Sequence, residues 1–266
     1  LVGSEMCIRD RIDVKKLADT FHVSKETIRR DLNILSENGL LLRTHGGAVL
    51  SRQEQVPASA SETPVSIRTV QNTSAKETIC RYAAKFINDG DTIFVDNSTT
   101  CVYLYKNLPP EMQVTIITNS ISFLAECAKV VNPNHTVVCL GGILKNSNLS
   151  FYGNITMKNA KQYYPNKAFI SCTGIASKSR ITDSGVQEID IKRFLIEASK
   201  EVFLLADEKK FQPIGQIFLC EYSNIDYLVT TQDADYDYLG LSDSESAKIH
   251  LSLIHISEPT RRTPIS

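Results

Sequence analysis

Six short apolar runs alternate with amphipathic stretches over most of the chain, and this alternation constrains the fold more than any other feature. The runs, each typical of a buried β-strand, are residues 92–95, 114–118, 136–140, 168–171, 201–206 and 227–230. Helical patterns lie between several of these runs, at residues 76–87, 120–131 and 186–199. Strands that alternate with helices in this way form a mainly parallel sheet covered by helices. We therefore predict an α/β domain with such a sheet over residues 73–250.

The chain has 266 residues, a length that suits one small domain before this larger one. Residues 51–64 are rich in Ser, Ala, Gln and Pro and lack an apolar period, which is typical of an interdomain linker. We place the linker at residues 51–72, between a small domain at residues 12–50 and the α/β domain.

The two ends of the chain have no periodicity that continues into their neighbours. Residues 1–11, LVGSEMCIRDR, and residues 251–261, LSLIHISEPTR, look like in-frame translations of a sequencing-library adapter. Real tails are the alternative, but adapter-like strings at both ends argue against it. We therefore exclude residues 1–11 and 251–266 from fold reasoning. The native part is expected to be truncated, beginning near Ile12 and ending in a helical-looking stretch at residues 242–250.

The composition excludes several classes of protein. With 42% hydrophobic and 22% charged residues and a net charge of -1, the chain has the composition of an ordinary globular protein. It contains no apolar run of the roughly 18 to 20 residues that a membrane span needs, and no signal-peptide pattern. We therefore predict a cytoplasmic protein without a membrane partner.

The cysteines and histidines do not form a metal-ligand pattern. Six of the seven cysteines lie singly in apolar stretches without a C-x-x-C spacing, so reduced thiols are expected. The histidines of the native part, His22, His45, His135 and His250, are far apart in the sequence. We predict no metal site, no cofactor and no catalytic residue.

Two helical patterns separated by a short turn begin the native part. In the first, residues 14–21, the side chains of Leu17, Ala18 and Phe21 share one face. The second extends over about residues 25–36. Helices joined by a turn of three to four residues have the spacing of a helix-turn-helix.

The second helical pattern has a defined start and two chemically different faces. Ser24 stands at the N-cap position, and Glu26 lies in the first turn, where its charge favours the helix dipole. Ile28, Leu32 and Leu35 recur at helical spacing and form the apolar face. The opposite face carries Lys25, Thr27, Arg29, Arg30 and Asn33. Such a helix can lie in the major groove of DNA with its N-terminal residues at base edges.

A short hairpin follows this helix. An Asn-Gly pair ends the helix, and β-type runs at residues 40–43 and 48–50 surround a glycine turn. This pattern predicts a wing with Arg43 and His45 near its tip. A helical hairpin whose charged face is merely solvated is the alternative. Because the cap, the turn, the basic face and the wing occur in the order of a winged helix-turn-helix, we predict that the polar face of the helix and the wing tip contact DNA.

These motifs resemble the DeoR family of bacterial sugar-metabolism regulators. The resemblance rests on residues 23–32, VSKETIRRDL, followed by residues 39–40 and by residues 43–48, RTHGGA. Members of the family have a further helix before the segment that starts at Ile12, which implies that this first helix is missing here. Residues 12–52 carry seven Lys or Arg and five Asp or Glu. Because this balance is only mildly basic, we expect a homo-oligomer that engages repeated half-sites of operator DNA.

Polar or glycine-containing turns follow three of the expected strands. The first strand runs into DNSTT, residues 96–100, and then into a helical pattern, an arrangement that binds anions. Thr118 and Asn119 repeat it after the next strand, and Gly141 and Gly142 follow the third. Such turns are also routine N-caps, but their repetition at the end of the sheet where ligands bind favours a pocket. Residues 96–100 are the candidate phosphate site.

The resemblance to the DeoR family extends over about residues 73–231, where the family has an effector domain similar in fold to sugar-phosphate isomerases. Carried over position by position, the family pattern falls on Lys76, Asp96, Ser98, Thr99, Thr100, Thr118, Asn119, Gly141, Gly142, Glu188, Lys192, Asp207 and Lys210, and also on Gly153, Phe211 and residues 173–175. Two departures are Ser98, where the family usually has Gly, and the pair Glu208 and Lys209, which replaces small hydroxyl residues. The resemblance implies a phosphorylated sugar as effector. The alternative for each lysine taken alone is a solvated surface residue.

The sequence therefore predicts a DNA-binding transcriptional regulator, a repressor of a sugar or carbohydrate operon that a phosphorylated sugar metabolite controls. In this mechanism the ligand-free protein holds its operator, and effector binding shifts the DNA-binding modules and weakens DNA binding. Effector-enhanced binding or activation is the alternative, which the sequence allows equally. The alternative is a sugar-phosphate isomerase-like enzyme fused to a DNA-binding module, in which Asp96, Glu188 and Lys210 supply acid–base groups. A protein–protein module without a ligand is a third interpretation, which the polar strand-end turns disfavour.

Overall fold

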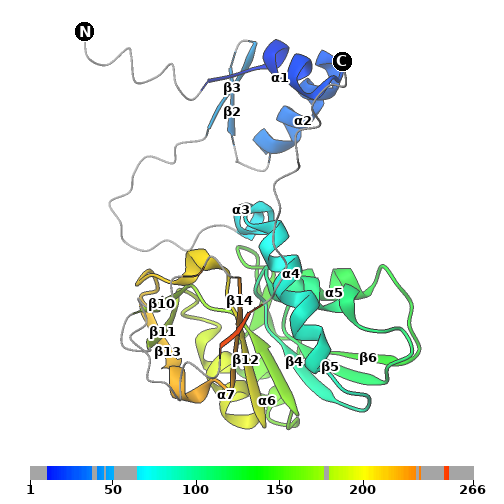
Figure 1. The fold of residues 1–266 in the computed structure, drawn as a ribbon, viewed down its shortest axis with the longest axis vertical. Coiled ribbons are helices and arrows are strands. Elements are labelled where there is room, and N and C mark those ends of the chain that lie inside the picture. The colour runs from blue at the N-terminus through cyan, green and yellow to red at the C-terminus, as the bar shows by residue number, and fades with distance from the viewer. Residues whose placement is uncertain are drawn as a thin grey trace, which may run out of the picture. The chain divides into compact units, whose positions relative to one another are not determined.

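The structure is a computed structural model of the chain (Figure 1). It describes residues 11–37, 41–44, 46–50, 65–176, 180–231, 234 and 249–251. The chain divides into two compact units, Leu1–Ser61 and Glu62–Ser266. Each unit has a hydrophobic core of its own.

The first unit combines two helices with a small antiparallel sheet. Its elements are β1 (Arg11–Asp13), α1 (Val14–Phe21), α2 (Lys25–Glu37), β2 (Leu41–Thr44) and β3 (Gly47–Leu50). The strand order is β1-β3-β2, and both pairings are antiparallel. The two helices and the hairpin predicted from the sequence are confirmed, and β1 is an additional strand that the sequence did not reveal.

Side-chain caps begin both helices of this unit. Asp13 Oδ1 accepts the backbone N–H groups of Lys15 at 2.8 Å and Lys16 at 3.0 Å at the start of α1. Ser24 Oγ accepts the N–H of Thr27 at 3.1 Å, which confirms its predicted role as the N-cap of α2.

The core of the first unit lies between the helices and the sheet. Its buried side chains are Val14, Ala18, Ile28, Leu32, Leu41 and Ala48, with Leu17 packed against them. The sequence also placed Phe21 on the apolar face of α1, and this expectation was wrong. Phe21 is the last residue of the helix, beyond the buried pair Val14 and Ala18, and is 63% exposed.

The second unit is built on one large parallel sheet. Its strands are β4 (Thr92–Val95), β5 (Val114–Thr118), β6 (His135–Cys139), β9 (Lys167–Ile170), β12 (Glu201–Leu205), β14 (Tyr227–Thr230) and β15 (Ile249–Leu251). The order is β15-β14-β12-β9-β4-β5-β6, and every neighbouring pair is parallel. The six strands predicted from apolar runs are therefore confirmed.

The two ends differ in detail from the sequence-based expectation. Residues 249 and 250 were expected to end a helix, but they belong to β15, which pairs with β14 in the sheet. Strands β1 and β15 each include one residue, Arg11 and Leu251, of the segments assigned to an adapter. The adapter origin of these segments stays a prediction.

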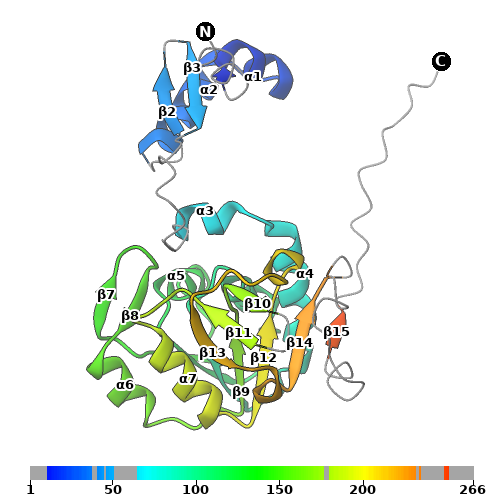
Figure 2. The same cartoon turned by 90° about the vertical axis from the view of Figure 1, so that its left-hand side faces the viewer.

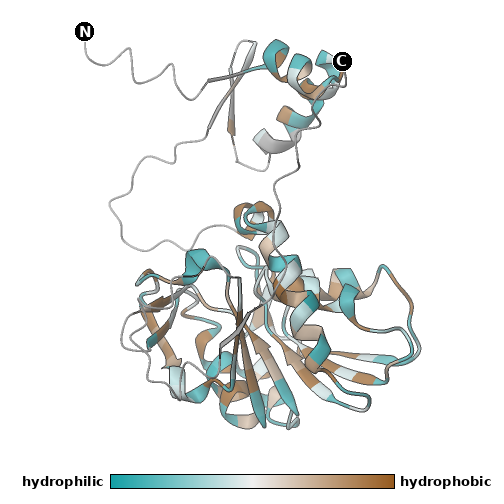
Figure 3. Cartoon of the chain, in the orientation of Figure 1, coloured by the Kyte–Doolittle hydropathy of each residue, from teal (hydrophilic) through white to brown (hydrophobic). Residues whose placement is uncertain are grey.

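Helices cover both faces of the sheet, as Figures 1 and 2 show. One face carries α4 (Thr73–Ala83), η1 (Ala84–Phe86), η2 (Cys101–Asn107) and α5 (Ile121–Cys127), and the other carries α6 (Asn154–Ala160) and α7 (Ile189–Ala198). Alternate strand residues supply the two cores: Ile93 and Val95 pack on the α4 side, and Phe94 packs on the α7 side. The sheet is accordingly apolar along its strands, while the helices are hydrophilic on part of their surface (Figure 3).

An aromatic stack crosses three strands on the α4 side of the sheet. The rings of Phe169 and Phe203 lie 4.8 Å apart, and those of Phe203 and Tyr227 lie 4.4 Å apart. These residues are register partners on β9, β12 and β14.

Among the described residues, no helix has the length and apolar character that a membrane span requires.

Several smaller elements surround the large sheet and were not predicted. They are the helix α3 (Val65–Val70), the hairpin of β7 (Ile143–Lys145) and β8 (Ser150–Tyr152), the antiparallel sheet of β10 (Gly174–Ala176), β11 (Arg180–Asp183) and β13 (Ile217–Glu221), and the short helices η3 (Glu208–Lys210) and η4 (Tyr222–Asn224). Helix α3 lies within the range 51–72 assigned to the linker, so the last part of that range is helical. Residues 51–64 lie outside the described part of the chain.

The order of the strands creates a switch point in the middle of the sheet. The chain runs outward from β4 to β5 and β6 and then returns to β9 on the other side of β4. The N–H of Asp96, directly after β4, donates to the carbonyl of Phe169 on β9 at 3.0 Å. In sheets of this kind, ligands bind outside the carboxyl ends of the strands at such a switch point.

Candidate functional site

A cavity of about 250 Å³ opens at the carboxyl ends of β4 and β9, where the strand order reverses. A second cavity of about 70 Å³ shares part of its wall. Ser98, after β4, and Ser171, after β9, line both cavities, as does Lys210 of η3. We call the two cavities together the strand-end pocket.

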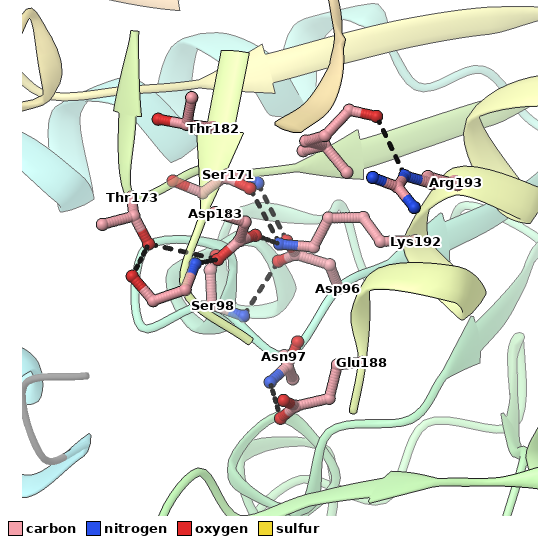
Figure 4. A network of polar contacts seen from close by, with 12 residues as sticks. Asp96, Asn97, Ser98, Ser171, Thr173, Thr182, Asp183, Glu188, Lys192 and Arg193 are labelled. Atoms are coloured by element: carbon pink, nitrogen blue, oxygen red, sulfur yellow. Dashed lines mark hydrogen bonds and ion pairs between the residues drawn. The ribbon is translucent and has the colours of Figure 1, made fainter. Parts of the chain in front are cut away.

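A buried ion-pair network lies at the floor of this pocket (Figure 4). The ammonium of Lys192, on α7, lies 2.6 Å from Asp183 Oδ2 and 3.1 Å from Asp96 Oδ2. It also donates to the carbonyl of Ser171 at 2.9 Å. Asp96 accepts the N–H groups of Ser98 and Ser171, each at 2.9 Å. The network therefore joins β11 and α7 to the ends of β4 and β9.

The partners in this network stabilise one another's charged forms. Burial lowers the pKa of Lys192, but the carboxylates of Asp183 and Asp96 outweigh burial and hold that pKa above its ordinary value. Burial raises the pKa of Asp183, but Lys192 and hydrogen bonds from Ser184 and Thr173 bring it below the usual range. An ammonium and a carboxylate thus remain charged beneath the pocket at neutral pH.

Glu188, at the start of α7, forms a second polar centre on the pocket wall. Its Oε1 accepts from Asn97 Nδ2 at 3.1 Å and from Asn148 Nδ2 at 2.9 Å. Ser150 Oγ donates to the same oxygen at 2.5 Å, and Lys145 Nζ lies 2.6 Å from Oε2. Because these four donors come from the β4 turn and the β7–β8 hairpin, Glu188 fixes the hairpin beside the pocket.

Gly185, which precedes Glu188 in the chain, lies close to the Glu188 carboxylate. A Cβ atom at Gly185 would lie 2.8 Å from Glu188 Oε2. A side chain at this position would therefore displace the carboxylate from its four donors.

Cationic groups line the pocket beside the β4 turn. Arg68 of α3, Lys209 and Lys210 line both cavities, and Lys76 of α4 lines the smaller one. The Lys76 ammonium is buried and lies 3.1 Å from Thr99 Oγ1. Burial lowers the pKa of Lys76 to about 8; Asp207 raises it, but Lys210 and Arg68 lower it further. Positive charge is thus concentrated beside the hydroxyl groups of the β4 turn.

Helix α2 of the first unit presents a polar surface. The side chains of Lys25, Thr27, Arg29, Arg30 and Asn33 are all exposed. Ile28 and Leu32, on the other face of α2, are buried in the core. Arg29 lies 3.2 Å from the carboxylate of Glu26, an exposed pair that contributes little to stability. The arginines are therefore available to a polyanion.

Comparison with known proteins gives the family of both units. Residues 7–54 match the model of the DeoR-like helix-turn-helix domain, and residues 71–232 match the DeoR C terminal sensor domain. The chain belongs to the DeoR family. It is a DNA-binding transcriptional regulator with a C-terminal sensor domain, and the resemblance stated from its sequence is confirmed.

Curated relatives of this DeoR-family chain cover nearly its whole length. It is 34% identical over 251 residues to the uncharacterized HTH-type transcriptional regulator YulB of Bacillus subtilis, over 94% of this chain and 93% of the relative. It is 31% identical over 219 residues to the glycerol-3-phosphate regulon repressor of Escherichia coli, over 82% and 84% of the two chains. The solved ribose 5-phosphate isomerase A of Methanocaldococcus jannaschii is 17% identical, with a TM-score of 0.39 over 53% of this chain and 55% of that one.

The structure brings most of the predicted effector residues of the DeoR pattern together. Those that line the strand-end pocket are Lys76, Ser98, Thr99, Thr100, Glu188, Lys192, Asp207 and Lys210. Asp96 lies directly beneath them in the ion-pair network. The turn after β4 leads into the 3-10 helix η2 rather than an α-helix.

Four predicted residues lie elsewhere: Thr118, Asn119, Gly141 and Gly142 do not line the strand-end pocket. Thr118 Oγ1 donates to the carbonyl of Val95 at 2.7 Å and accepts the N–H of Ser120 at 3.0 Å. Asn119 pairs through its backbone carbonyl and its side-chain amide with Phe151 of β8. They lie away from the pocket because β5 and β6 are on the side of β4 away from β9, and their role in effector binding stays a prediction.

The glycine pair after β6 also has a structural reason. The Thr156 hydroxyl donates to the carbonyl of Gly141 at 2.6 Å. Gly142 has a φ of 120°, and a Cβ atom there would lie 2.1 Å from Thr156 Oγ1. Gly142 therefore permits a close approach to α6, whereas Gly141 has open space where a Cβ would lie and adopts a left-handed backbone with a φ of 61°.

Several pocket residues were missed by sequence reasoning. Asn97 lies inside the recognised β4 turn, and Asp183 precedes a Ser-Gly pair after β11, so both carried a detectable turn pattern. Arg68 was hidden in the expected linker. Asn148 reaches Glu188 from a hairpin that the apolar pattern did not reveal.

Part of the predicted DNA contact lies outside what the structure describes. Arg43 belongs to β2, but its side chain and the whole of His45 are outside the described residues.

The described cysteines are free thiols, and burial raises the pKa of Cys80, Cys101 and Cys172. Within the described ranges, no group of three or more His, Cys, Asp or Glu side chains is placed to hold a metal ion.

Proposed function

We propose that this DeoR-family regulator binds a small phosphorylated sugar or polyol in the strand-end pocket, and that binding changes its affinity for operator DNA. The observation that carries the proposal is the unequal chemistry of the two sides of the pocket. Lys76 and Lys210 gather at the smaller cavity, and Glu188 with its amide partners lies on the wall of the larger one. Arg68 lies between the two, because it lines both cavities and its guanidinium donates to Asn148. A ligand with an anionic end and a hydroxyl-bearing end is complementary to this arrangement.

The cationic side suits a phosphate group. Ammonium groups bind phosphate as point charges, and a guanidinium offers a planar set of donors. Thr99 and Thr100 add hydroxyl donors at the same place. The phosphate contacts are therefore assigned to Lys76, Lys210 and the hydroxyls of the β4 turn, with Arg68 in addition.

The other side suits the hydroxyl groups of a sugar or polyol. Asn97, Thr173 and Ser184 line it together with Glu188. These groups are held in place by hydrogen bonds, because Asn97 donates to Glu188 at 3.1 Å and Thr173 donates to Asp183 at 3.1 Å. Fixed polar groups of this kind select a ligand by the positions of its hydroxyls.

The size of the cavity favours a small metabolite. Its volume of about 250 Å³ lies below the roughly 300–1,000 Å³ that is typical of pockets for drug-sized ligands. The relative from Escherichia coli is named as a repressor of a glycerol-3-phosphate regulon, which supports repression by this chain and a phosphorylated polyol as one candidate class.

Binding without turnover accounts for the geometry better than isomerisation. An isomerase needs a carboxylate that is free to move a proton between adjacent carbons. Asp96 is fully buried and accepts hydrogen bonds on both oxygens, and it does not line either cavity. Glu188 is held by four donors. Neither carboxylate is positioned as a free base.

The DNA-binding form is proposed to be a homo-oligomer. One helix-turn-helix reads one half-site, so two or more copies are needed to engage repeated half-sites with useful affinity. Sedimentation of the protein with and without operator DNA measures the number of copies. A single copy on the operator would contradict this part of the proposal.

Operator binding in the presence of candidate effectors tests the function. Fluorescence anisotropy would follow release of an operator selected from random duplexes, against a panel of sugar and polyol phosphates and their unphosphorylated forms. Product analysis on the same samples separates binding from turnover. We expect one phosphorylated compound to shift the operator Kd without being converted. Conversion of that compound would identify an enzyme and overturn the proposal.

A further inference from the structure

Helix α3 contacts the strand-end pocket through Arg68, and its first residue, Val65, donates its N–H to the carbonyl of Ser147 at 3.4 Å. None of the side chains of α3 is buried, and Val70 is 67% exposed. The Arg68 guanidinium donates to Asn148 Oδ1, and the Arg68 carbonyl accepts from the Lys76 ammonium. The Thr99 hydroxyl lies 3.4 Å from the same carbonyl. Because no side chain of α3 is fully buried, and only Val65, Ile67 and Arg68 are half-buried, these polar contacts form an important part of its docking.

The docked position of α3 brings like charges together. Arg68 and Lys210 both line the smaller cavity and act on the buried Lys76 ammonium to lower its pKa. Asp207 opposes them, but it is one carboxylate beside the four cationic side chains that line this cavity, Lys209 included. An anion in this cavity would relieve the repulsion. The docking of α3 is therefore expected to strengthen when a phosphate group is present.

We propose that α3 is an arm that a bound phosphate group clamps against the pocket through Arg68, Lys76 and Lys210. The inference rests on the proposed function, because it gives a regulatory role to the phosphate side of the same pocket. Without the anion, repulsion among the three cations leaves α3 weakly docked. With the anion, the same three charges hold α3 in place.

The position of α3 in the chain gives this docking a consequence. α3 is the first described element of the second unit, and residues 51–64 join it to the last strand of the first unit. A docked α3 fixes the point at which these residues leave the sensor unit. A released α3 adds its own length to the connection and loosens the coupling between effector and operator.

Hydrogen exchange of the whole protein measures the docking directly. Mass spectrometry would follow amide exchange in residues 65–70 without ligand, with inorganic phosphate, and with the sugar phosphate that the operator panel identifies. We expect both anions to slow exchange in α3, and the unphosphorylated sugar to leave it unchanged. Arg68→Gln should abolish the slowing, and Arg68→Lys should restore part of it because it keeps the charge.

Arg81→Gln is the matched control, because Arg81 is an exposed arginine of α4 that does not line the pocket. This variant should retain the full protection of α3. If calorimetry shows that the sugar phosphate binds but amide exchange in α3 is unchanged, the proposal that α3 is a clamped arm is wrong, while the proposed function stands. Absence of binding by every phosphorylated compound would refute the proposed function itself. In Arg68→Gln, the operator Kd with and without effector should become equal.

Discussion

The ammonium of Lys192 lies 2.6 Å from Asp183 Oδ2, and this contact fastens helix α7 to strand β11 beneath the pocket. Both side chains are buried, and Asp96 completes the network from the end of β4. The network is thus as much a part of the scaffold as of the site. Its removal should affect folding before it affects ligand specificity.

Replacing Lys192 by Met tests this role. The variant leaves two buried carboxylates without their cation, and breaking a buried pair in this way costs about 3–5 kcal/mol. Urea denaturation should show this loss in the free energy of unfolding. Lys200→Met, at an exposed lysine after α7, is the control and should change stability by less than about 0.5 kcal/mol. A second variant, Lys192→Met with Asp183→Asn, should recover part of the loss, and no recovery would argue against the pair.

The lowered pKa of Lys76 predicts a pH dependence of effector binding. With a pKa of about 8, Lys76 loses its charge as the pH rises above 8. A phosphate monoester, whose second pKa is about 6, keeps its charge over this range. Calorimetry between pH 7 and pH 9 should therefore show affinity falling as the pH rises. The Lys76→Met protein should bind more weakly and lose most of this pH dependence; an unchanged profile would remove Lys76 from the phosphate contact.

The same residue makes an opposite contribution to the stability of the ligand-free protein. The folded-state pKa of about 8 lies below the value of about 10.4 in the unfolded chain. Between these values the unfolded state binds more protons, so the contribution of Lys76 makes stability rise with pH from about 8 to 10.4. The difference between wild type and Lys76→Met in urea denaturation across this range measures it. If the difference does not vary with pH, the folded state does not lower the pKa of Lys76.

The hydroxyl of Thr99 should matter for effector binding and not for DNA binding. It lies 3.1 Å from the Lys76 ammonium at the smaller cavity. Thr99→Ala removes one donor to the phosphate, worth about 1.5–3 kcal/mol for a hydrogen bond to a charged group. Calorimetry should show a Kd for the effector raised about 10- to 100-fold, while anisotropy shows unchanged operator affinity without effector. Equal effector affinity in the two proteins would exclude this turn as the phosphate site.

The exposed arginines of α2 are expected to contact the operator. Arg29→Ala and Arg30→Ala should each raise the operator Kd, and loss of a phosphate contact should reduce the slope of log K against log salt by about one. Arg81→Ala, on the sensor unit, serves as the control. If both α2 variants keep the affinity and salt slope of the wild type, α2 does not read DNA through these side chains.

The large sheet could be predicted from the sequence because its strands are buried on both faces. The runs that form β4 and β5 are mostly apolar and almost wholly buried, and helix α4 before them has a clear helical period. The smaller β7–β8 hairpin escaped prediction because its residues are partly exposed and polar residues interrupt it. The same holds for α3, which buries no side chain.

The site could be predicted only in part, because the local apolar pattern predicts where strands are but not the order in which they lie in the sheet. The turn after β4 was found, but the turns after β5 and β6 were assigned to the same pocket. Strand β4 pairs with β5 on one side and with β9 on the other; the cavity opens on the β9 side, where Ser171 and Thr173 line it. Contacts that join distant segments, such as Asn148 to Glu188, follow from the tertiary fold alone.

The division between the ion-pair floor and the wall of the pocket has an evolutionary consequence. Lys192 and Asp96 are committed to holding strand ends and α7 together, so selection for folding acts on them directly. Asn97, Ser184 and Lys209 line the wall outside this ion-pair network, on the β4 turn, after β11 and on η3. A protein built on this scaffold can come to bind a different effector through a few substitutions in the wall of the pocket, while the buried ion pairs that stabilise the sensor unit stay the same.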